Sequence, residues 1–404
     1  MNVAATEGTL REVVDALAGL RRAAGSPGEQ QAAAWIAERL QRAGCPAEVQ
    51  EAEFLDGYAR VMSPLAAASL AAGSLAWPGR ATGSRRRRAA GLIAAALTGL
   101  IADDISNGPR LFRRAAAARR TTHNVVGTCG DTGAERTLVV LAHHDAAPTG
   151  AIFDDRVQVW LGDRFPGLLE RIDTSLPLWW ALMAAPGLVG LGALRDRRGM
   201  ITAGMVASAV GVATFEDIAR AEIVPGANDN LSAVAVQVAL AERLAAEPIG
   251  GLRVILASCG AEEVVQGGIY GFAERHFASL HRTRTWFLNL ETVGSPKLVM
   301  LEGEGPVVME DYHDRDFRDL VARCAERAGV PMRRGMRARN STDAVIPSRA
   351  GYPTATLCSL DRYKALSNYH QMSDTPENLD YRTVRAALQV TEAVARELAV
   401  NPWL

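Results

Sequence analysis

Histidine and carboxylate side chains stand at the ends of several apolar runs and in polar turns of this sequence. They are His143, Asp145, Asp229, Glu262, Glu263, Glu291 and His370. Histidine nitrogens and carboxylate oxygens, with no cysteine among them, suit Zn²⁺ and similar divalent ions. A pair of such ions can bridge and activate a water molecule. Each residue alone is more often structural than catalytic, so the prediction of a metal site rests on their joint placement.

The first of these side chains follows a short run of apolar, β-branched residues. Residues 137–141, TLVVL, predict a buried strand that ends at His143. Because side chains alternate along a strand, His143 and Asp145 share one face while His144 points away. A histidine can ligate a metal while a carboxylate two positions later orients the site. The alternative for this stretch alone is an ordinary polar strand end.

The consecutive glutamates Glu262 and Glu263 can divide the work of a hydrolytic site. One can bind metal, while the other takes a proton from the metal-bound water and passes it to the leaving amine. The alternative for such a pair is the solvated start of a helix, which is its commoner role.

Strand and helix patterns alternate in the segments that carry these residues. Apolar runs predict strands at 47–54, 137–141, 252–258, 285–291 and 354–360. Helices are predicted between most of them, so the expected fold class is α/β, with a mostly parallel central sheet flanked by helices. In open sheets of this kind, sites form outside the carboxyl ends of the strands. His143, Glu262, Glu263 and Glu291 all lie at such ends.

Four uncharged stretches depart from this pattern. They are residues 61–79, 89–102, 174–194 and 199–215, and arginines stand between the members of each pair. We predict two inserted apolar helical hairpins, at 58–110 and 172–217, that pack together as one element. The remaining segments, 1–57, 121–165 and 222–404, are predicted to form the hydrolase domain.

The inserted element has several possible roles. A transmembrane helix needs about 20 apolar residues, a length that 174–194 reaches and 89–102 does not. The element is expected to contact a membrane, to form a homodimer interface, or to cover the site and favour apolar substrates. The alternative is a soluble bundle whose apolar faces are buried within the protein.

Composition narrows the possible partners and compartments. The chain has 44 Lys and Arg against 45 Asp and Glu, so no overall charge points to nucleic acid. Its five cysteines are few and widely spaced, which excludes a disulfide framework and a CxxC zinc site. The first residues lack the basic start and apolar core of a signal peptide. We therefore expect a cytoplasmic or membrane-associated protein.

Six motifs, in this order and spacing, resemble the co-catalytic zinc aminopeptidases, which are relatives of glutamate carboxypeptidase II and glutaminyl cyclase. They are AHHDA (142–146), PGANDNLSAVA (225–235), AEE (261–263), LNLETVG (288–294), GYPTATL (351–357) and YHQMSDTPENLD (369–380). The resemblance covers roughly residues 1–55, 121–150 and 222–404. It implies the zinc-aminopeptidase fold, interrupted by the two apolar hairpins.

The resemblance implies two zinc ions in each chain. By this correspondence His143 and Glu291 bind one ion, and Glu263 and His370 bind the other. Asp229 would bridge both ions.

The resemblance also implies roles for Glu262 as general base and for Asp145 as the residue that orients His143. A zinc metallopeptidase is expected, most specifically an aminopeptidase in which a metal-bound hydroxide attacks a peptide or small amide substrate. One alternative is a hydrolase of non-peptide amides or a glutaminyl cyclase-like enzyme. An alternative of another class is a non-catalytic membrane or scaffold protein on the same fold.

The sequence departs from the family pattern at several positions. Glu291 stands where aspartate is commoner, and EEVVQGG suggests a longer loop beside the substrate. In RARNSTDA (337–344), Asp343 remains but Ala344 replaces a histidine. The family's tyrosine, which can polarise the scissile carbonyl, is not found there, and Arg339 or Asn340 is the candidate substitute.

Overall fold

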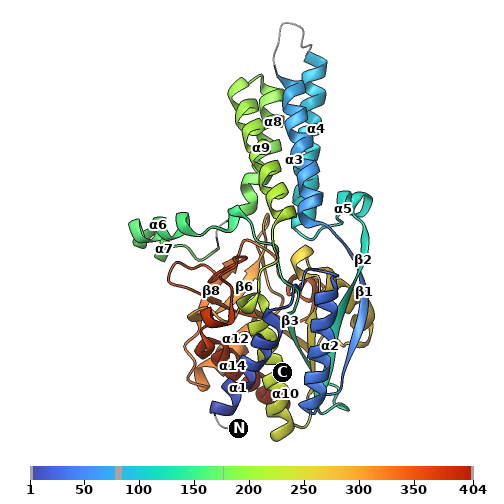
Figure 1. Ribbon diagram of the computed structural model, residues 1–404, viewed down its shortest axis with the longest axis vertical. Helices are drawn as coiled ribbons and strands as arrows, with labels where there is room; N and C mark the ends of the chain where they lie inside the picture. The colour runs from blue at the N-terminus through green and yellow to red at the C-terminus, as the bar shows by residue number, and fades with distance from the viewer. Residues whose placement is uncertain (1–2, 78–83, 176, 402–404) are drawn as a thin grey trace.

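A mixed β-sheet lies at the centre of the α/β domain (Figure 1). The computed structural model of the chain describes residues 3–77, 84–175 and 177–401. Within them, nine strands form the sheet in the order β1-β2-β4-β3-β5-β9-β6-β7, with β8 paired to β6. The strands are β1 (Ala47–Leu55), β2 (Arg119–Gly130), β3 (Thr137–His143), β4 (Arg253–Cys259), β5 (Thr285–Glu291), β6 (Lys297–Glu304), β7 (Glu310–Asp311), β8 (Arg333–Ala338) and β9 (Thr354–Leu360).

The centre of the sheet is parallel and its outer parts are largely antiparallel. Strands β4, β3, β5 and β9 run parallel, so their carboxyl ends meet at one edge. Strands β1, β2 and β4 pair antiparallel, as do β9, β6 and β7. The predicted α/β class with helices on both faces is confirmed, but "mostly parallel" describes only the central strands. Short connections such as 292–296 reverse the chain, whereas parallel neighbours need a longer crossover.

Helices cover both faces of the sheet. Leu138 and Val140 of β3 pack in one core with α1, α2, α10, α12 and α14, and Val139 and Leu141 pack in another with α11. This alternation is what a strand covered on both faces requires. The helices are α1 (Val3–Ala18), α2 (Pro27–Arg42), α10 (Ser232–Ala246), α11 (Gly267–His276), α12 (Arg315–Arg327), α13 (Val345–Arg349) and α14 (Tyr381–Val400).

A stalk of four helices projects from one end of the α/β domain (Figure 1). It consists of α3 (Tyr58–Ala76), α4 (Ser84–Ile105), α8 (Leu178–Arg195) and α9 (Arg198–Arg220). Helices α4 and α9 each pack against both α3 and α8, so the two inserted hairpins form one bundle. The helix expected within 174–194 begins only after Pro177. Among the described residues, α9 alone meets the length and hydropathy expected of a membrane-crossing helix.

Small residues bring the stalk helices close together. A Cβ atom at Gly204 of α9 would lie 2.7 Å from the Val189 side chain of α8. A Cβ atom at Gly73 of α3 would lie 2.4 Å from Met205. A side chain at position 204 would also lie 2.7 Å from the Ala185 carbonyl oxygen and would force α8 and α9 apart, whereas at position 73 the Met205 side chain would have to move.

Three further short helices lie near the base of the stalk. They are α5 (Leu111–Ala116), α6 (Arg156–Arg164) and α7 (Pro166–Glu170). Helices α6 and α7 form a side arm that extends away from the α/β domain (Figure 1).

Candidate active site

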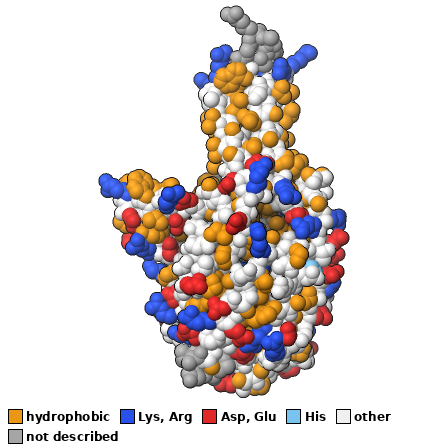
Figure 2. All heavy atoms as spheres, viewed as in Figure 1, with side chains coloured by type: hydrophobic (Ala, Val, Ile, Leu, Met, Phe, Trp, Pro, Cys, Tyr) orange, Lys and Arg blue, Asp and Glu red, His pale blue; other side chains and the backbone are white. Residues whose placement is uncertain are grey.

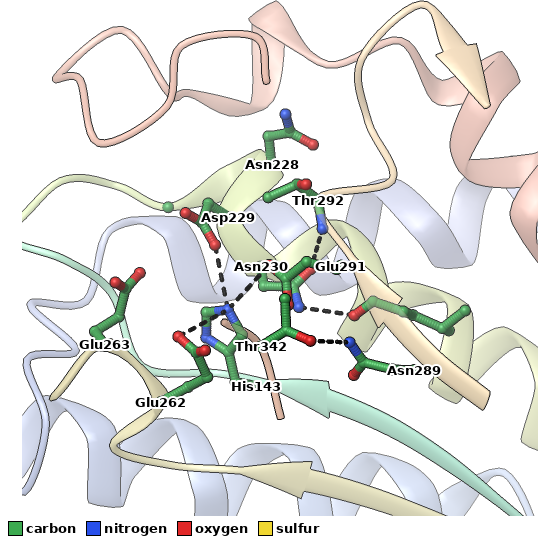
Figure 3. Close-up of polar contacts among 12 residues, drawn as sticks. His143, Asn228, Asp229, Asn230, Glu262, Glu263, Asn289, Glu291, Thr292 and Thr342 are labelled. Atoms are coloured by element: carbon green, nitrogen blue, oxygen red, sulfur yellow. Dashed lines mark hydrogen bonds and ion pairs between the residues drawn. The ribbon is translucent and has the colours of Figure 1, made fainter. Parts of the chain in front are cut away.

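The structure places the predicted residues at the edge where the parallel strands end (Figure 3). His143 is the last residue of β3, and Glu291 is the last residue of β5. Glu262 and Glu263 form a short 3₁₀ helix shortly after β4. Asp229 lies in the irregular turn that leads into α10. His370 comes from the loop after β9 and faces the same point.

Asp229 lies between the two histidines. Its Oδ1 is 3.2 Å from Nε2 of His143, and its Oδ2 is 3.3 Å from Nε2 of His370. Glu291 Oε1 lies 3.6 Å from the His143 nitrogen, and Glu263 Oε2 lies 3.2 Å from the His370 nitrogen. The side chains thus form two ligand groups that share one carboxylate.

The chemistry of these groups fits two divalent cations. The atoms of each group, His143–Asp229–Glu291 and His370–Asp229–Glu263, lie within 4.8 Å of one another. Nε2 of His143 and Nε2 of His370 are buried and face these carboxylate oxygens, but neither forms a well-aligned hydrogen bond among the described residues. An unsatisfied buried polar atom costs about 1–3 kcal/mol, and metal ligation would remove that cost. Burial raises the pKa of Glu263 and Glu291, and nearby cations would restore their ionised forms.

Glu262 approaches this centre from the side. Its Oε2 lies 4.0 Å from Nε2 of His143, and its Oε1 accepts a hydrogen bond of 2.8 Å from the side-chain amide of Gln266. Burial raises the pKa of Glu262 well above its ordinary value. A carboxylate with a raised pKa is a better proton acceptor, as a general base requires.

Asp145 holds the turn that carries both glutamates. Its Oδ1 accepts a hydrogen bond of 3.0 Å from the backbone N–H of Glu262, and its Oδ2 accepts one of 3.1 Å from that of Glu263. The same carboxylate lies 3.4 Å from Nδ1 of His143. One side chain therefore positions three residues of the centre, which is more than the predicted orientation of His143 alone.

Comparison with known proteins identifies the family. Residues 195–395, about half of the chain, match the model of Peptidase family M28. The chain belongs to peptidase family M28. This match confirms the predicted resemblance to the co-catalytic zinc aminopeptidases. It also confirms the prediction of a zinc metallopeptidase. The matched M28 segment contains Asp229, Glu263, Glu291 and His370, whereas His143 precedes the second hairpin and lies outside it.

Solved structures share the fold. The aminopeptidase from Aneurinibacillus sp. strain AM-1 has a TM-score of 0.54 at 16% identity, over 97% of this chain and 94% of that one. BSAP, a zinc aminopeptidase from Bacillus subtilis, has a TM-score of 0.55 at 14% identity, over 99% and 95%. A Bacteroides thetaiotaomicron glutaminyl cyclase bound to N-acetylhistamine has a TM-score of 0.56 at 13% identity, over 98% and 97%. No curated protein matches the chain in sequence.

Arg22, which the sequence analysis did not single out, connects two segments of the M28 site through hydrogen bonds to their backbone. Its fully buried guanidinium donates hydrogen bonds to the carbonyl oxygens of His144 (2.8 Å), Pro225 (2.8 Å) and Gly226 (3.1 Å). It thereby joins the end of β3 to the turn that carries Asp229. Burial lowers the pKa of Arg22 to about 10, although the surrounding carboxylates oppose the shift. No local pattern marks this residue, because its partners are backbone atoms distant in sequence.

Asp374 and Glu29 are two further carboxylates that support the M28 site. Asp374 accepts hydrogen bonds from the backbone N–H groups of Asn228 (2.7 Å) and Asp229 (3.1 Å), and burial raises its pKa to about 7. Glu29 accepts one of 3.0 Å from Ala261 N–H, and burial raises its pKa to about 8. Asp374 lies in the YHQMSDTPENLD motif, for which the sequence analysis assigned it no role, and Glu29 comes three residues after Ser26, the N-cap of α2.

His144 is a buried neutral side chain rather than a metal ligand. It points away from the metal-ligating atoms, and its Nδ1 lies 3.0 Å from the Ser258 hydroxyl. Burial lowers the pKa of His144 to about 3.

A cavity of about 930 Å³ opens beside the M28 site. Glu262, Glu263, Glu291 and His370 form its polar end. Much of its wall is apolar and includes Tyr58, Ile105 and Trp179 of the stalk and Ile152, Phe153 and Trp160 at or near the arm. The insertions therefore line the space that a substrate would occupy.

The region that departs from the family pattern also borders this cavity. Arg339 and Asn340 both line it, and the guanidinium carbon of Arg339 lies 5.2 Å from the centre of the Trp180 ring. Asp343 is buried behind the cavity, and burial raises its pKa well above the ordinary value. Arg339 and Asn340 remain the candidates for contact with the substrate carbonyl.

Glu304 of β6 fastens the loop that contains Asp343. Its Oε2 accepts hydrogen bonds from the Thr342 backbone N–H (3.1 Å), the Thr342 hydroxyl (3.0 Å) and the Tyr312 hydroxyl (2.8 Å). Burial raises the pKa of Glu304 from 4.5 to about 8, so its carboxyl group is largely neutral in the folded protein at neutral pH.

Glu304→Gln is expected to make the protein less sensitive to alkaline pH. A raised folded-state pKa means that Glu304 contributes stability that is fully present below about pH 4.5 and is lost as the pH rises through about 8. Glutamine keeps an acceptor oxygen and cannot ionise. Near pH 9 the variant should be more stable than the wild type by about 1–3 kcal/mol, and near pH 5 the two should be alike. Thermal unfolding at both pH values measures the difference, and a larger gain near pH 5 would contradict the assignment.

Proposed function

We propose that the chain is an aminopeptidase that uses two zinc ions. The observation that carries the proposal is the position of Asp229, whose two oxygens face two separate histidine and glutamate pairs. His143 and Glu291 would hold one ion, and Glu263 and His370 the other. The zinc ions, when bound, supply the Lewis acidity that activates water and stabilises negative charge on the carbonyl oxygen.

Glu262 supplies the proton transfer in this proposal. Because Gln266 donates a hydrogen bond to Oε1, the other carboxylate oxygen, Oε2, is the one that faces the ligand atoms. Oε2 accepts the proton of the attacking water and then gives it to the leaving amine. Asp145 holds Glu262 and Glu263 in position relative to His143, because it accepts hydrogen bonds from the backbone N–H groups of both glutamates.

Metal analysis joined to a substrate screen tests the proposal. The purified chain is expected to contain two zinc ions, to hydrolyse a series of L-aminoacyl arylamides, and to lose that activity when 1,10-phenanthroline removes the metal. Added Zn²⁺ should restore activity and raise the melting temperature, because the ions bind only the folded site. Activity that survives complete metal removal would refute the proposal. Cyclisation of N-terminal glutaminyl peptides without arylamide hydrolysis would refute the aminopeptidase assignment.

A further inference from the structure

The outer surface of the stalk is apolar along most of its length (Figure 2). Large apolar side chains of α4, α8 and α9 are between 44% and 64% exposed, among them Leu92, Ile93, Leu191, Val206 and Val210. No charged residue lies in 89–102 of α4 or in 199–215 of α9. Soluble proteins rarely expose a continuous apolar surface of this kind without something to cover it.

The interior of the stalk combines apolar side chains with small and hydroxyl-bearing residues. The hydroxyls of Ser69 and Ser208 meet between α3 and α9 at 2.8 Å, and both residues are fully buried. Glycines occupy the closest helix contacts, as at Gly73 and Gly204. Small residues and interhelical hydroxyl bonds inside, with branched apolar side chains outside, are typical of helix packing in lipid.

The exposed apolar side chains lie on opposite sides of the bundle. Because α4 and α9 each pack against α3 and α8, they occupy diagonal corners. Leu92 and Ile93 of α4 therefore face away from Val206 and Val210 of α9. A second copy of the chain that docks on one face would leave the other exposed, whereas a lipid environment covers both.

The charge-free segments of α4 and α9 are slightly shorter than the hydrocarbon core of a bilayer, and arginines stand at their outer ends. At 1.5 Å per residue the charge-free segments are about 21–26 Å long, and the hydrocarbon core of a bilayer is about 30 Å thick. Arginines dominate the described part of the tip, namely Arg85, Arg86, Arg87, Arg88, Arg195, Arg197 and Arg198, with Asp196 paired to Arg87 at 2.9 Å. Long arginine side chains can reach anionic headgroups from such a depth.

The side arm exposes apolar side chains near the base of the stalk (Figures 1 and 2). Val157 and Trp160 of α6 and Phe165 beyond it are exposed, and Arg156 and Arg164 flank them. A tryptophan with neighbouring arginines is typical of helices that lie at the membrane surface.

We propose that the four-helix stalk inserts into a lipid bilayer and that α6 rests on the membrane surface beside it. The apolar sides of α4 and α9 contact acyl chains, and the arginine tip contacts anionic headgroups. This proposal is independent of the reaction that the M28 site performs.

Vesicle flotation tests the proposal. The full chain, purified in mild detergent, is mixed with phosphatidylcholine vesicles with or without phosphatidylglycerol and then separated on a density gradient. The wild type is expected to float, and more completely with the anionic lipid. The double variants Leu92→Asp/Ile93→Asp and Val206→Asp/Val210→Asp should float far less, because each carboxylate lowers partition into the bilayer roughly 100-fold.

Val400→Asp is the matched control, because Val400 is exposed at the end of α14, outside the stalk. It should float like the wild type.

Melting curves in detergent verify that all variants fold, and sedimentation without detergent gives their oligomeric state. A wild type that remains a monodisperse monomer without detergent and does not float would overturn the proposal. The proposal would also be overturned if the wild type forms a discrete dimer that one double variant dissociates and does not float. A second copy of the chain would then be what covers the apolar surface. Flotation does not depend on arylamide hydrolysis. A failure to float would therefore refute the membrane proposal without bearing on the proposed reaction.

Discussion

Glu262→Gln is expected to lower kcat roughly 1,000-fold or more while the chain keeps its full complement of metal. Glutamine has nearly the size of glutamate and can keep the hydrogen bond between position 262 and Gln266, but it cannot accept a proton from water. The measurements are steady-state hydrolysis of an aminoacyl arylamide and zinc content by elemental analysis.

Glu263→Gln is the matched comparison for this variant. The two glutamates are adjacent, and both of their backbone N–H groups bond to Asp145. Only Glu263 lies within 3.2 Å of the His370 nitrogen. The Glu263→Gln variant is therefore expected to lose metal as well as activity. Substantial turnover by Glu262→Gln, or metal loss from that variant as severe as from Glu263→Gln, would remove Glu262 from its role.

Asp229→Asn is expected to weaken binding of both zinc ions together. The substitution removes a negative charge that the two ligand groups share and turns one oxygen into an amide that cannot ligate. We expect a loss of at least about 100-fold in zinc affinity at each site. Zinc titration followed by calorimetry measures both sites separately.

His143→Ala and Asp374→Asn are the comparisons for Asp229→Asn. His143 belongs to one ligand group, so its removal should empty one site and leave the other occupied. The Asp374 carboxylate accepts hydrogen bonds from the backbone N–H groups before and at Asp229, so its replacement by an amide should cause a smaller loss of zinc affinity, roughly 10-fold. Two independent zinc sites in Asp229→Asn, each of unchanged affinity, would show that the carboxylate does not bridge.

The sequence predicted which side chains lie together because these side chains follow a simple rule of chain geometry. Parallel strands bring their carboxyl ends to one edge, so residues that follow β3, β4 and β5 meet wherever the sheet forms. His143, Glu262, Glu263 and Glu291 could be placed in this way. The supporting residues could not, because the bonds of Arg22 and Asp374 run to backbone atoms of turns whose shape only the folded chain defines.

Strands β6, β7 and β8, at one side of the sheet, were not predicted for a different reason. Strand β8 is RRGMRA, with little apolar alternation, and it pairs with β6. Glu302 of β6 accepts hydrogen bonds from Arg334 at 2.8 Å and from Arg318 at 2.9 Å. At this edge of the sheet, ion pairs and backbone bonds to neighbours add to a small apolar cluster that includes Leu301 and Met336. Such pairs are visible only after the strands are aligned.

The contact between the end of α4 and the glutamate turn limits how a shortened, water-soluble form of the enzyme can be made. Asn107, just beyond α4, donates a hydrogen bond of 2.7 Å to the carbonyl oxygen of the Gln266 side chain, and Arg110 donates one of 2.6 Å to the Val265 carbonyl. Deletion of the whole segment 58–110 would leave these two carbonyl oxygens without their hydrogen-bond donors. Both lie close to the Gln266 amide that donates a hydrogen bond to Glu262. A truncation that removes only the outer turns of the helices and retains Asn107 and Arg110 keeps that amide in place.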